Sequence, residues 1–233
     1  MEIKPGVFYG VGIGPGDPEL LTLKALRVLE RCPVIAAPQT KSGEMLALDI
    51  ARQAAALEDK TILPLFFTME RDKEKQQQAH MRAADAVEEH LAAGRDVAML
   101  NLGDVSIYAT YSYLKDLLDQ RGYETEMVPG VPSFCAVAAQ LGVSLTTMNA
   151  PLHIVPAGGG PLRETLAMPG TKVLMKSGRE FPQVRSTLRE KGLLQYASMV
   201  QDCGLPTQQV YQTLESAPEE AGYFTTIIVK EES

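Results

Sequence analysis

The chain has 233 residues, of which 45% are hydrophobic and 22% charged, and its formal net charge is −7. These values are typical of a globular protein with a substantial core, and they exclude nucleic-acid recognition through a broad basic surface. An acidic chain can still bind an anionic small molecule, because a few Lys or Arg side chains in one cleft suffice. No apolar stretch reaches the roughly 18 residues that would span a membrane, so no membrane contact is expected.

The cysteines and the first residues indicate a cellular compartment. Cys32, Cys135 and Cys203 are odd in number and form no CxxC pair, which disfavours a disulfide framework or a zinc site. No group of His, Cys and carboxylate residues has the spacing of a metal site. The opening residues, MEIKPGVFYG, lack the basic and apolar regions of an export signal. The sequence therefore predicts a cytoplasmic protein without a metal.

Strand and helix patterns alternate through the first half of the chain. Strands are expected at 7–11, 34–37, 61–66 and 97–102, and the helices between and after them at 22–31, 45–57, 73–93 and 108–120. Such alternation requires crossover connections, and it predicts a mostly parallel sheet.

The second half has more strands for each helix. Strands are expected at 126–128, 172–175, 197–200, 210–213 and 223–229, and helices at 133–141 and 182–191, with a loop-rich passage around 153–170. This ratio predicts a mixed sheet. The sequence therefore predicts an α/β protein with an N-terminal domain over residues 1–121 and a C-terminal domain over residues 122–233.

A glycine-rich stretch, GIGPGDPELLTLKAL, follows the first expected strand. A dinucleotide-binding loop needs G-x-G-x-x-G directly before a helix, so that the pyrophosphate meets the helix N-terminus. Here Pro15 removes a backbone N–H, and the helix begins late, with Thr22 as a suitable N-cap. A tight turn without a ligand and an active-site loop therefore fit the pattern equally well, and a phosphate-binding loop fits it less well.

Three further stretches each allow a structural and a functional interpretation. Asp104, in LGDVSIY, follows a buried strand and either caps the next helix or faces a ligand cleft. Ser133, in VPGVPSF, is well placed to cap a helix of small residues. Lys176 and Arg179, in VLMKSGR, end an apolar strand, where cations reach either solvent or an anionic ligand.

These four stretches, in this order, resemble the signature motifs of the tetrapyrrole methylases, and YFTTIIV resembles the family's last strand. The resemblance covers essentially the whole chain. Val105 stands where most members have Pro, a change that the branch methylating C20 of precorrin-2 or cobalt-factor II tolerates. Gln201, in VQDCGLPTQQV, replaces the Glu of a further family segment.

The resemblance implies a class III S-adenosylmethionine methyltransferase fold. In that fold two α/β domains, the first with a parallel and the second with a mixed sheet, have the active site in the cleft between them. It further implies a homodimer that methylates C20 of precorrin-2 or cobalt-factor II in cobalamin biosynthesis and releases S-adenosylhomocysteine. Three alternatives stay open: methylation of another corrin carbon, methylation of uroporphyrinogen III, and a non-catalytic nucleotide-binding regulatory module.

The same resemblance assigns candidate residues. Catalytic roles are expected for Asp104, Lys176 and Tyr223, with Asp104 either orienting a pyrrole N–H or accepting a proton. The tetrapyrrole substrate is expected to contact Gly14, Pro15, Asp17 and Arg179. The residues expected to hold S-adenosylmethionine are Pro15, Leu102, Gly103, Asp104, Ile107, Pro132, Ser133, Lys176, Cys203 and Thr226.

Overall fold

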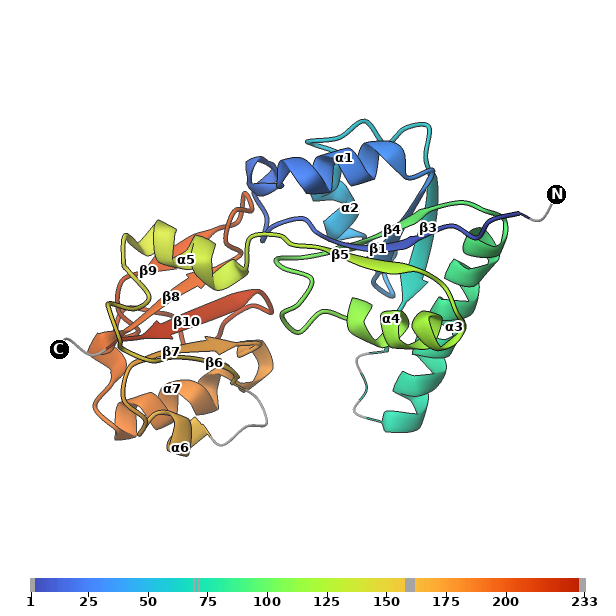
Figure 1. The fold of residues 1–233 in the computed structure, drawn as a ribbon. Coiled ribbons are helices and arrows are strands. Elements are labelled where there is room, and N and C mark those ends of the chain that lie inside the picture. Colours follow the sequence, from blue (N-terminus) through green and yellow to red (C-terminus); the bar gives the residue numbers. More distant parts are fainter. Residues whose placement is uncertain (1–2, 69, 71, 158–161, 231–233) are drawn as a thin grey trace. The chain divides into compact units, whose positions relative to one another are not determined.

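The computed structural model describes residues 3–68, 70, 72–157 and 162–230 of the chain. The chain divides into two units, Met1–Pro132 and Ser133–Ser233, and each is built around one sheet (Figure 1). In the described residues no helix is both long and apolar enough to cross a membrane.

The described residues of the N-terminal unit form a five-stranded sheet in the order β3-β2-β4-β1-β5, with every neighbouring pair parallel. The strands are β1 (Phe8–Gly12), β2 (Val34–Gln39), β3 (Thr61–Phe66), β4 (Val97–Asn101) and β5 (Thr125–Val128). All residues of β1 and β4 are buried, as expected for central strands with helices on both faces. β1 lies between β4 and β5, so these three strands end at the same edge of the sheet.

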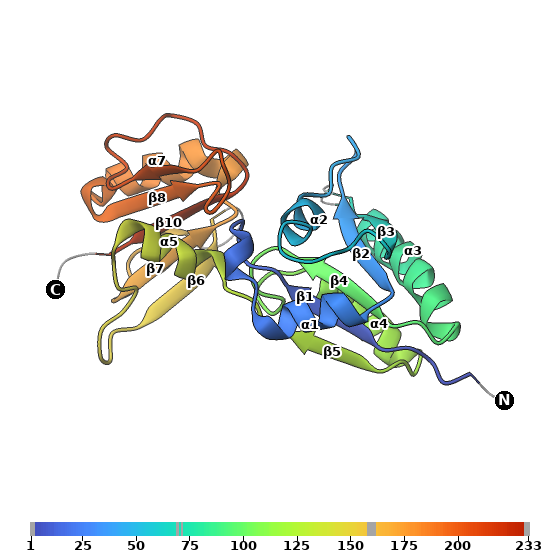
Figure 2. The same cartoon turned by 90° about the horizontal axis from the view of Figure 1, so that it is seen from above.

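Helices cover both faces of this sheet. α1 (Leu23–Arg31) and α2 (Leu46–Ala51) lie on one face, and α3 (Lys73–Ala92) and α4 (Tyr111–Gln120) lie on the other (Figures 1 and 2). Thr22 caps α1, as the sequence predicts, because its hydroxyl accepts a hydrogen bond from the Ala25 amide at 3.1 Å. A short 3₁₀ helix, η1 (Pro18–Leu20), precedes α1.

Tyr111 joins α4 to the strands beneath it. Its side chain is fully buried, and its hydroxyl donates to the carbonyl oxygens of Phe8 at 3.2 Å and Glu126 at 3.0 Å. The ring lies against β1 at Gly10, where an added Cβ would be only 2.6 Å from ring carbons. A glycine in the middle of β1 is therefore required by the packing of this tyrosine.

The described residues of the C-terminal unit form a second five-stranded sheet, in the order β6-β7-β10-β8-β9. The strands are β6 (Leu152–Pro156), β7 (Thr171–Met175), β8 (Ala197–Gln201), β9 (Gln209–Tyr211) and β10 (Thr225–Val229). β6 and β7 are parallel, and the other neighbours are antiparallel. This sheet is therefore mixed, as predicted.

In the described part of the C-terminal unit, one α-helix lies on one face of the sheet and two lie on the other. α5 (Ser133–Leu141) packs against β8 and β10, while α6 (Leu162–Thr165) and α7 (Phe181–Glu190) cover the opposite face (Figure 1). Two short 3₁₀ helices, η2 (Gly178–Glu180) and η3 (Leu194–Tyr196), flank α7. The core beneath α7 contains Leu174, Phe181, Leu188, Ile227 and Val229.

Besides shifts of a few residues at element ends, such as α4 beginning at Tyr111 and not at residue 108, the structure differs from the sequence predictions in three larger respects. The units divide after Pro132 and not between residues 121 and 122, because β5 pairs with β1 and completes the first sheet. α2 ends at Ala51, where a helix to residue 57 was expected, because the chain continues as turns with bonds such as Gln53 N–H to Ile50 O. β6 and α6 lie in the passage expected to be loops; β6 has no fully buried residue and so lacks a strong apolar pattern.

Candidate functional site

Three loops meet at one edge of the N-terminal sheet. They follow β1, β4 and β5 and comprise residues 12–17, 101–108 and 129–132, which we call the N-terminal loop cluster. Because these strands are adjacent and parallel, their carboxyl ends bring the loops together. In α/β sheets this edge is where ligands usually bind.

Glycines allow the backbones of the three loops to contact one another directly. Gly14 and Gly103 form an isolated bridge, in which the Gly103 N–H donates to Gly14 O at 2.8 Å and the Gly14 N–H donates to Gly103 O at 3.2 Å. A Cβ at Gly130 would lie 2.3 Å from Gly103 O and 2.7 Å from the Gly12 carbonyl carbon. Gly130 therefore faces only backbone atoms, and a side chain there would force the loops apart.

Asp104 holds two of these loops together. Its side chain is 8% exposed; one carboxylate oxygen accepts hydrogen bonds from the amide of Ser106 at 2.8 Å and from the Ser106 hydroxyl. The other oxygen accepts a bond from the Gly130 amide at 2.8 Å. Burial alone would raise the pKa of Asp104, but the hydrogen bonds from Ser106, Gly130 and the Val105 amide outweigh it, so the pKa is lowered.

The other predicted residues of this unit also belong to the N-terminal loop cluster. Pro15, Leu102 and Ile107 lie in the N-terminal loop cluster and are partly buried there. Asp17 lies farther along the first loop, where its carboxylate caps η1 by accepting a hydrogen bond from the Glu19 amide at 2.8 Å. Pro132 is the last residue of the unit.

A second set of loops lies at one edge of the C-terminal sheet. β7 and β8 both run antiparallel to β10, which lies between them, so their carboxyl ends flank the start of β10. The loops comprise residues 176–178, 201–204 and 222–224, which we call the C-terminal loop cluster. It brings together three predicted residues: Lys176, Cys203 and Tyr223.

Two residues of this cluster other than glycine have left-handed backbone conformations. Lys176 follows β7 with a φ of 54°, and Asp202 follows β8 with a φ of 51°. The Asp202 amide donates to Phe224 O at 2.9 Å, and its carboxylate accepts a bond from the Thr207 hydroxyl at 2.9 Å. Such conformations are uncommon for residues other than glycine, and they gather at functional sites.

Lys176, Cys203 and Tyr223 have different environments. Partial burial lowers the pKa of the Lys176 ammonium, although the side chain keeps an exposed surface. Cys203 is 7% exposed, whereas Tyr223 is 57% exposed and makes an edge-to-face contact with the Phe224 ring at 5.0 Å between centroids. The cluster therefore combines a cation, a buried thiol and an accessible aromatic pair.

Gln201 contributes a buried acceptor to the same cluster. Its Oε1 has no hydrogen-bond partner among the described residues, and a Cβ at Gly222 would lie 2.9 Å from its Nε2. Buried side-chain oxygens are normally hydrogen-bonded, so an acceptor of this kind is suited to a donor on a ligand.

Three predicted residues lie apart from the loop tips. Thr226 is buried within β10, opposite Val200 of β8, and Ser133 is the first residue of α5. The backbone of Arg179 belongs to η2, but its side chain lies outside the described residues.

Sequence reasoning missed Gly130, Ser106, Gln201 and Asp202 as members of the loop clusters. The Pro-Gly pair at 129–130 indicates a turn, but not that the glycine amide binds a carboxylate 26 residues earlier. The polar pair at 201–202, placed directly after an apolar strand, is the signal that could have indicated the second cluster.

Known proteins resemble this chain over nearly its whole length. A profile of the tetrapyrrole (corrin/porphyrin) methylases matches residues 7–218. A precorrin-2 C(20)-methyltransferase of Sinorhizobium sp is 32% identical over 96% of this chain and 95% of its own length. A cobalt-precorrin-2 C(20)-methyltransferase of Salmonella typhimurium is 29% identical over 97% of both chains. The structure of a uroporphyrin-III C-methyltransferase from Thermus thermophilus complexed with S-adenosylhomocysteine is 26% identical, with a TM-score of 0.69, over 97% of this chain and 98% of that one.

Proposed function

Because this chain belongs to the tetrapyrrole methylases, we propose that it is an S-adenosylmethionine-dependent methyltransferase acting on C20 of precorrin-2 or its cobalt-containing counterpart in cobalamin biosynthesis. The observation that carries the proposal is the similarity to a relative named for this reaction, which extends over 96% of the chain. Coverage of this extent includes both loop clusters, so it supports a common activity as well as a common fold.

The loop clusters fit S-adenosylmethionine better than a dinucleotide. Pro15 offers no N–H to a phosphate, and the Gly14 and Gly103 amides are already used by the bridge between their loops. The buried Oε1 of Gln201 suits an amino group, and S-adenosylmethionine carries one on its methionine part that a dinucleotide lacks. Within the proposal the cofactor contacts are Pro15, Leu102, Gly103, Asp104, Ile107, Pro132, Ser133, Lys176, Cys203 and Thr226.

When bound, this cofactor supplies an electrophilic methyl group on a sulfonium. The task of the protein is then to align the ring carbon with that methyl group and to exclude water, since orientation can supply several kcal/mol of a barrier. The loops of the N-terminal cluster are suited to this task because backbone bridges and the Asp104 carboxylate fix their positions.

Asp104 is better suited to orienting than to accepting a proton. Its lowered pKa makes it a weak base near neutral pH, and both of its oxygens already accept hydrogen bonds. We therefore retain the orienting role for Asp104 and treat proton acceptance as the less favoured option. Lys176 and Arg179 are proposed to pair with acetate and propionate groups of the substrate, with Gly14, Pro15, Asp17 and Tyr223 as further substrate contacts.

A direct assay tests the proposed reaction. The protein is incubated with methyl-labelled S-adenosylmethionine and, in separate reactions, precorrin-2, its cobalt-containing counterpart or uroporphyrinogen III, and the methylated carbon of each product is assigned by NMR. Label at C20 is expected. Label at another carbon would show that the proposed ring position is wrong. Methylation of uroporphyrinogen III alone would show that the proposed substrate is wrong. Binding of S-adenosylhomocysteine without turnover of any tetrapyrrole would favour the regulatory module instead.

We also propose that the protein is a cytoplasmic homodimer. Cys32, Cys135 and Cys203 form no disulfide in the structure, which agrees with a reducing compartment. The dimer rests on the family resemblance, and sedimentation equilibrium tests it directly. A mass near 25.3 kDa at micromolar concentration would contradict the dimer.

A further inference from the structure

Helices α3 and α4 pack side by side on the N-terminal sheet, and the two ends of their contact differ in chemistry (Figure 1). At the end farther from the loop cluster, Arg121 follows α4 and forms ion pairs with Asp85 at 2.8 Å and with Glu88. At the other end, the imidazole of His80 lies parallel to the ring of Tyr113, with 4.5 Å between the centroids and 8° between the planes. One end of the contact is therefore ionic and the other is aromatic.

The aromatic end lies beside the N-terminal loop cluster. Tyr113 is in the first turn of α4, the helix that follows the loop of residues 101–108. The ring of Phe67, the residue after β3, lies 5.9 Å from the His80 ring between centroids. Val105 of the loop cluster belongs to the hydrophobic core of this unit, and Phe67 packs against the same core. We call Phe67, His80 and Tyr113 the aromatic cluster.

The ring of Tyr113 is supported from behind and open in front. Tyr113 is 55% exposed although His80 covers one face of its ring, so the exposed surface includes the opposite face. Burial lowers the pKa of His80, so its imidazole is neutral near pH 7 and brings no charge to the stack. The two rings therefore present an uncharged and preorganised aromatic surface.

The carboxyl edge of the N-terminal sheet is wide enough for one large ring-shaped ligand to reach both clusters. The order β3-β2-β4-β1 puts three strand spacings, about 14 Å in all, between β1, which leads into the loop cluster, and β3, which leads into Phe67. A tetrapyrrole with its acetate and propionate side chains is large enough to span this distance.

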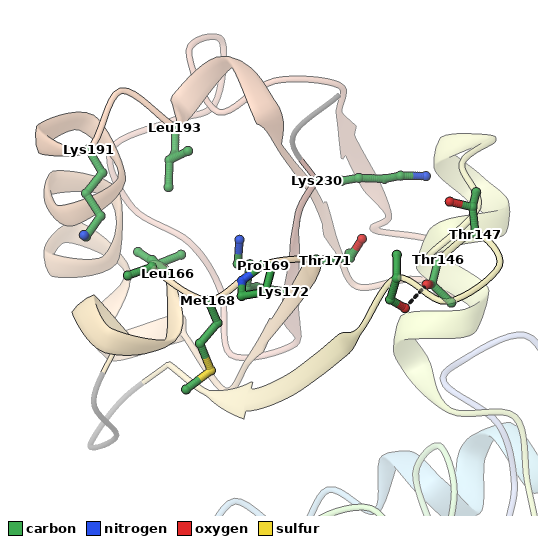
Figure 3. A pocket seen from close by; sticks show the side chains of 13 residues that line it. Thr146, Thr147, Leu166, Met168, Pro169, Thr171, Lys172, Lys191, Leu193 and Lys230 are labelled. Carbon is green, nitrogen blue, oxygen red and sulfur yellow. Dashed lines mark hydrogen bonds between the residues drawn. The ribbon is translucent and has the colours of Figure 1, made fainter. Parts of the chain in front are cut away.

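The C-terminal unit contains a pocket that lies apart from its own loop cluster. The pocket has a volume of about 610 Å³ and lies against the start of β7, where Thr171 and Lys172 line it (Figure 3). Lys176 of the C-terminal loop cluster follows the other end of this strand. Among the described residues that line the pocket, none is proposed above to contact the cofactor or the tetrapyrrole.

We propose that the aromatic cluster is a recognition surface for the tetrapyrrole, in which the open face of Tyr113 stacks against one pyrrole ring of the macrocycle. This inference rests on the function proposed above, from which it takes the substrate. The loop cluster then holds the reacting side of the macrocycle, and the aromatic cluster fixes its orientation through an uncharged part. Offset stacking of two rings is favourable beyond the apolar area that it buries.

Anaerobic absorbance titration of the protein tests this surface, because it measures binding without turnover. Precorrin-2 and its cobalt-containing counterpart are used as separate probes. Tyr113→Ala should weaken binding at least fivefold, and Tyr113→Phe, which keeps the ring, should restore most of the affinity. Unchanged affinity in Tyr113→Ala, an equal loss in Tyr113→Phe, or no saturable binding of either probe to the wild type would overturn the proposal.

Two variants in the C-terminal unit are the controls. Tyr196→Ala removes an exposed tyrosine of η3, and it should bind the tetrapyrrole as the wild type does. An equal loss in this variant would mean that removal of any exposed tyrosine weakens binding, and it would contradict the surface. Lys191→Met changes the pocket of Figure 3 and should also leave the affinity unchanged. A loss in Lys191→Met with none in Tyr113→Ala would place the tetrapyrrole in that pocket and overturn the proposal.

A second readout separates this inference from the proposed methyltransferase function. The Kd for S-adenosylhomocysteine should be the same in Tyr113→Ala and the wild type, because the aromatic cluster contains no proposed cofactor contact. A raised Kd would contradict a role confined to the tetrapyrrole. Methylation by a wild type whose tetrapyrrole affinity does not depend on Tyr113 would overturn the surface alone. Binding that requires Tyr113 but is not followed by methylation would overturn the proposed function alone.

Discussion

Replacing Gly130 by alanine tests whether the crossing of the three N-terminal loops depends on glycine. The new Cβ would lie 2.3 Å from Gly103 O and 2.8 Å from Gly12 Cα, closer than the 3.0 Å that real Cβ atoms essentially never undercut. Both neighbours are backbone atoms, one in the last residue of β1 and the other in the loop after β4, so relief requires the loops themselves to move. Overpacking of this kind costs about 1–3 kcal/mol.

The same movement disturbs the hydrogen bond from the Gly130 amide to Asp104. A hydrogen bond to a charged group contributes about 1.5–3 kcal/mol. We therefore expect the free energy of unfolding of Gly130→Ala to be lower than that of the wild type by about 3–5 kcal/mol. Urea denaturation followed by circular dichroism measures this difference.

Gly122→Ala is the matched control. Gly122 has a φ of 86° but no heavy atom within 4 Å of a built Cβ, so its replacement adds only backbone strain of about 1 kcal/mol. If Gly130→Ala lost no more stability than Gly122→Ala, the steric argument for the loop crossing would be refuted.

Three further substitutions test individual contacts. Asp104→Asn should destabilise the protein by about 1–3 kcal/mol at pH 7, because one amide side chain cannot accept all the bonds that the carboxylate accepts. Because folding lowers the pKa of Asp104, its ionised carboxylate contributes its full stabilisation of the folded state above the unfolded pKa of about 3.9. That stabilisation is lost as the pH falls through the folded pKa. The difference in the free energy of unfolding between wild type and Asp104→Asn, measured by urea titration, should therefore become smaller in acid. Tyr111→Phe should cost about 1–2 kcal/mol in the same assay, since its hydroxyl bonds two strand carbonyls; an unchanged midpoint would show that these bonds add nothing. Lys176→Met should raise the KM for the tetrapyrrole about tenfold in steady-state assays, equivalent to about 1.4 kcal/mol, and an unaltered KM would reject its proposed anion contact.

The sequence predicts most of the first unit because its patterns are local. Strands β1 to β4 and the helices between them follow from apolar runs and periodicity, and Thr22 is identified as a cap by its position before α1. The division between the units depends instead on a pairing between β5 and β1, more than a hundred residues apart in the chain. Nothing in the short strand Thr125–Val128 indicates that partner.

The candidate site is predictable only in part for the same reason. The motifs identify Gly14, Gly103 and Asp104, because each loop has unusual residues in sequence. The contact between Asp104 and the Gly130 amide, and the buried acceptor on Gln201, arise from the meeting of separate loops. The partners of a side chain across a sheet edge are a property of the topology, and no single stretch contains them.

The position of β1 between β4 and β5 has a consequence for folding during synthesis. The amide of Val7 bonds Asp96, 89 residues later, and β1 is paired with β4 and β5 along its length. A ribosome that has released only the first hundred residues has therefore made an apolar strand whose second neighbour does not yet exist. One edge of β1 in the nascent chain therefore stays without its partner strand until β5 has emerged, and an unpaired apolar strand is exposed to aggregation for that time.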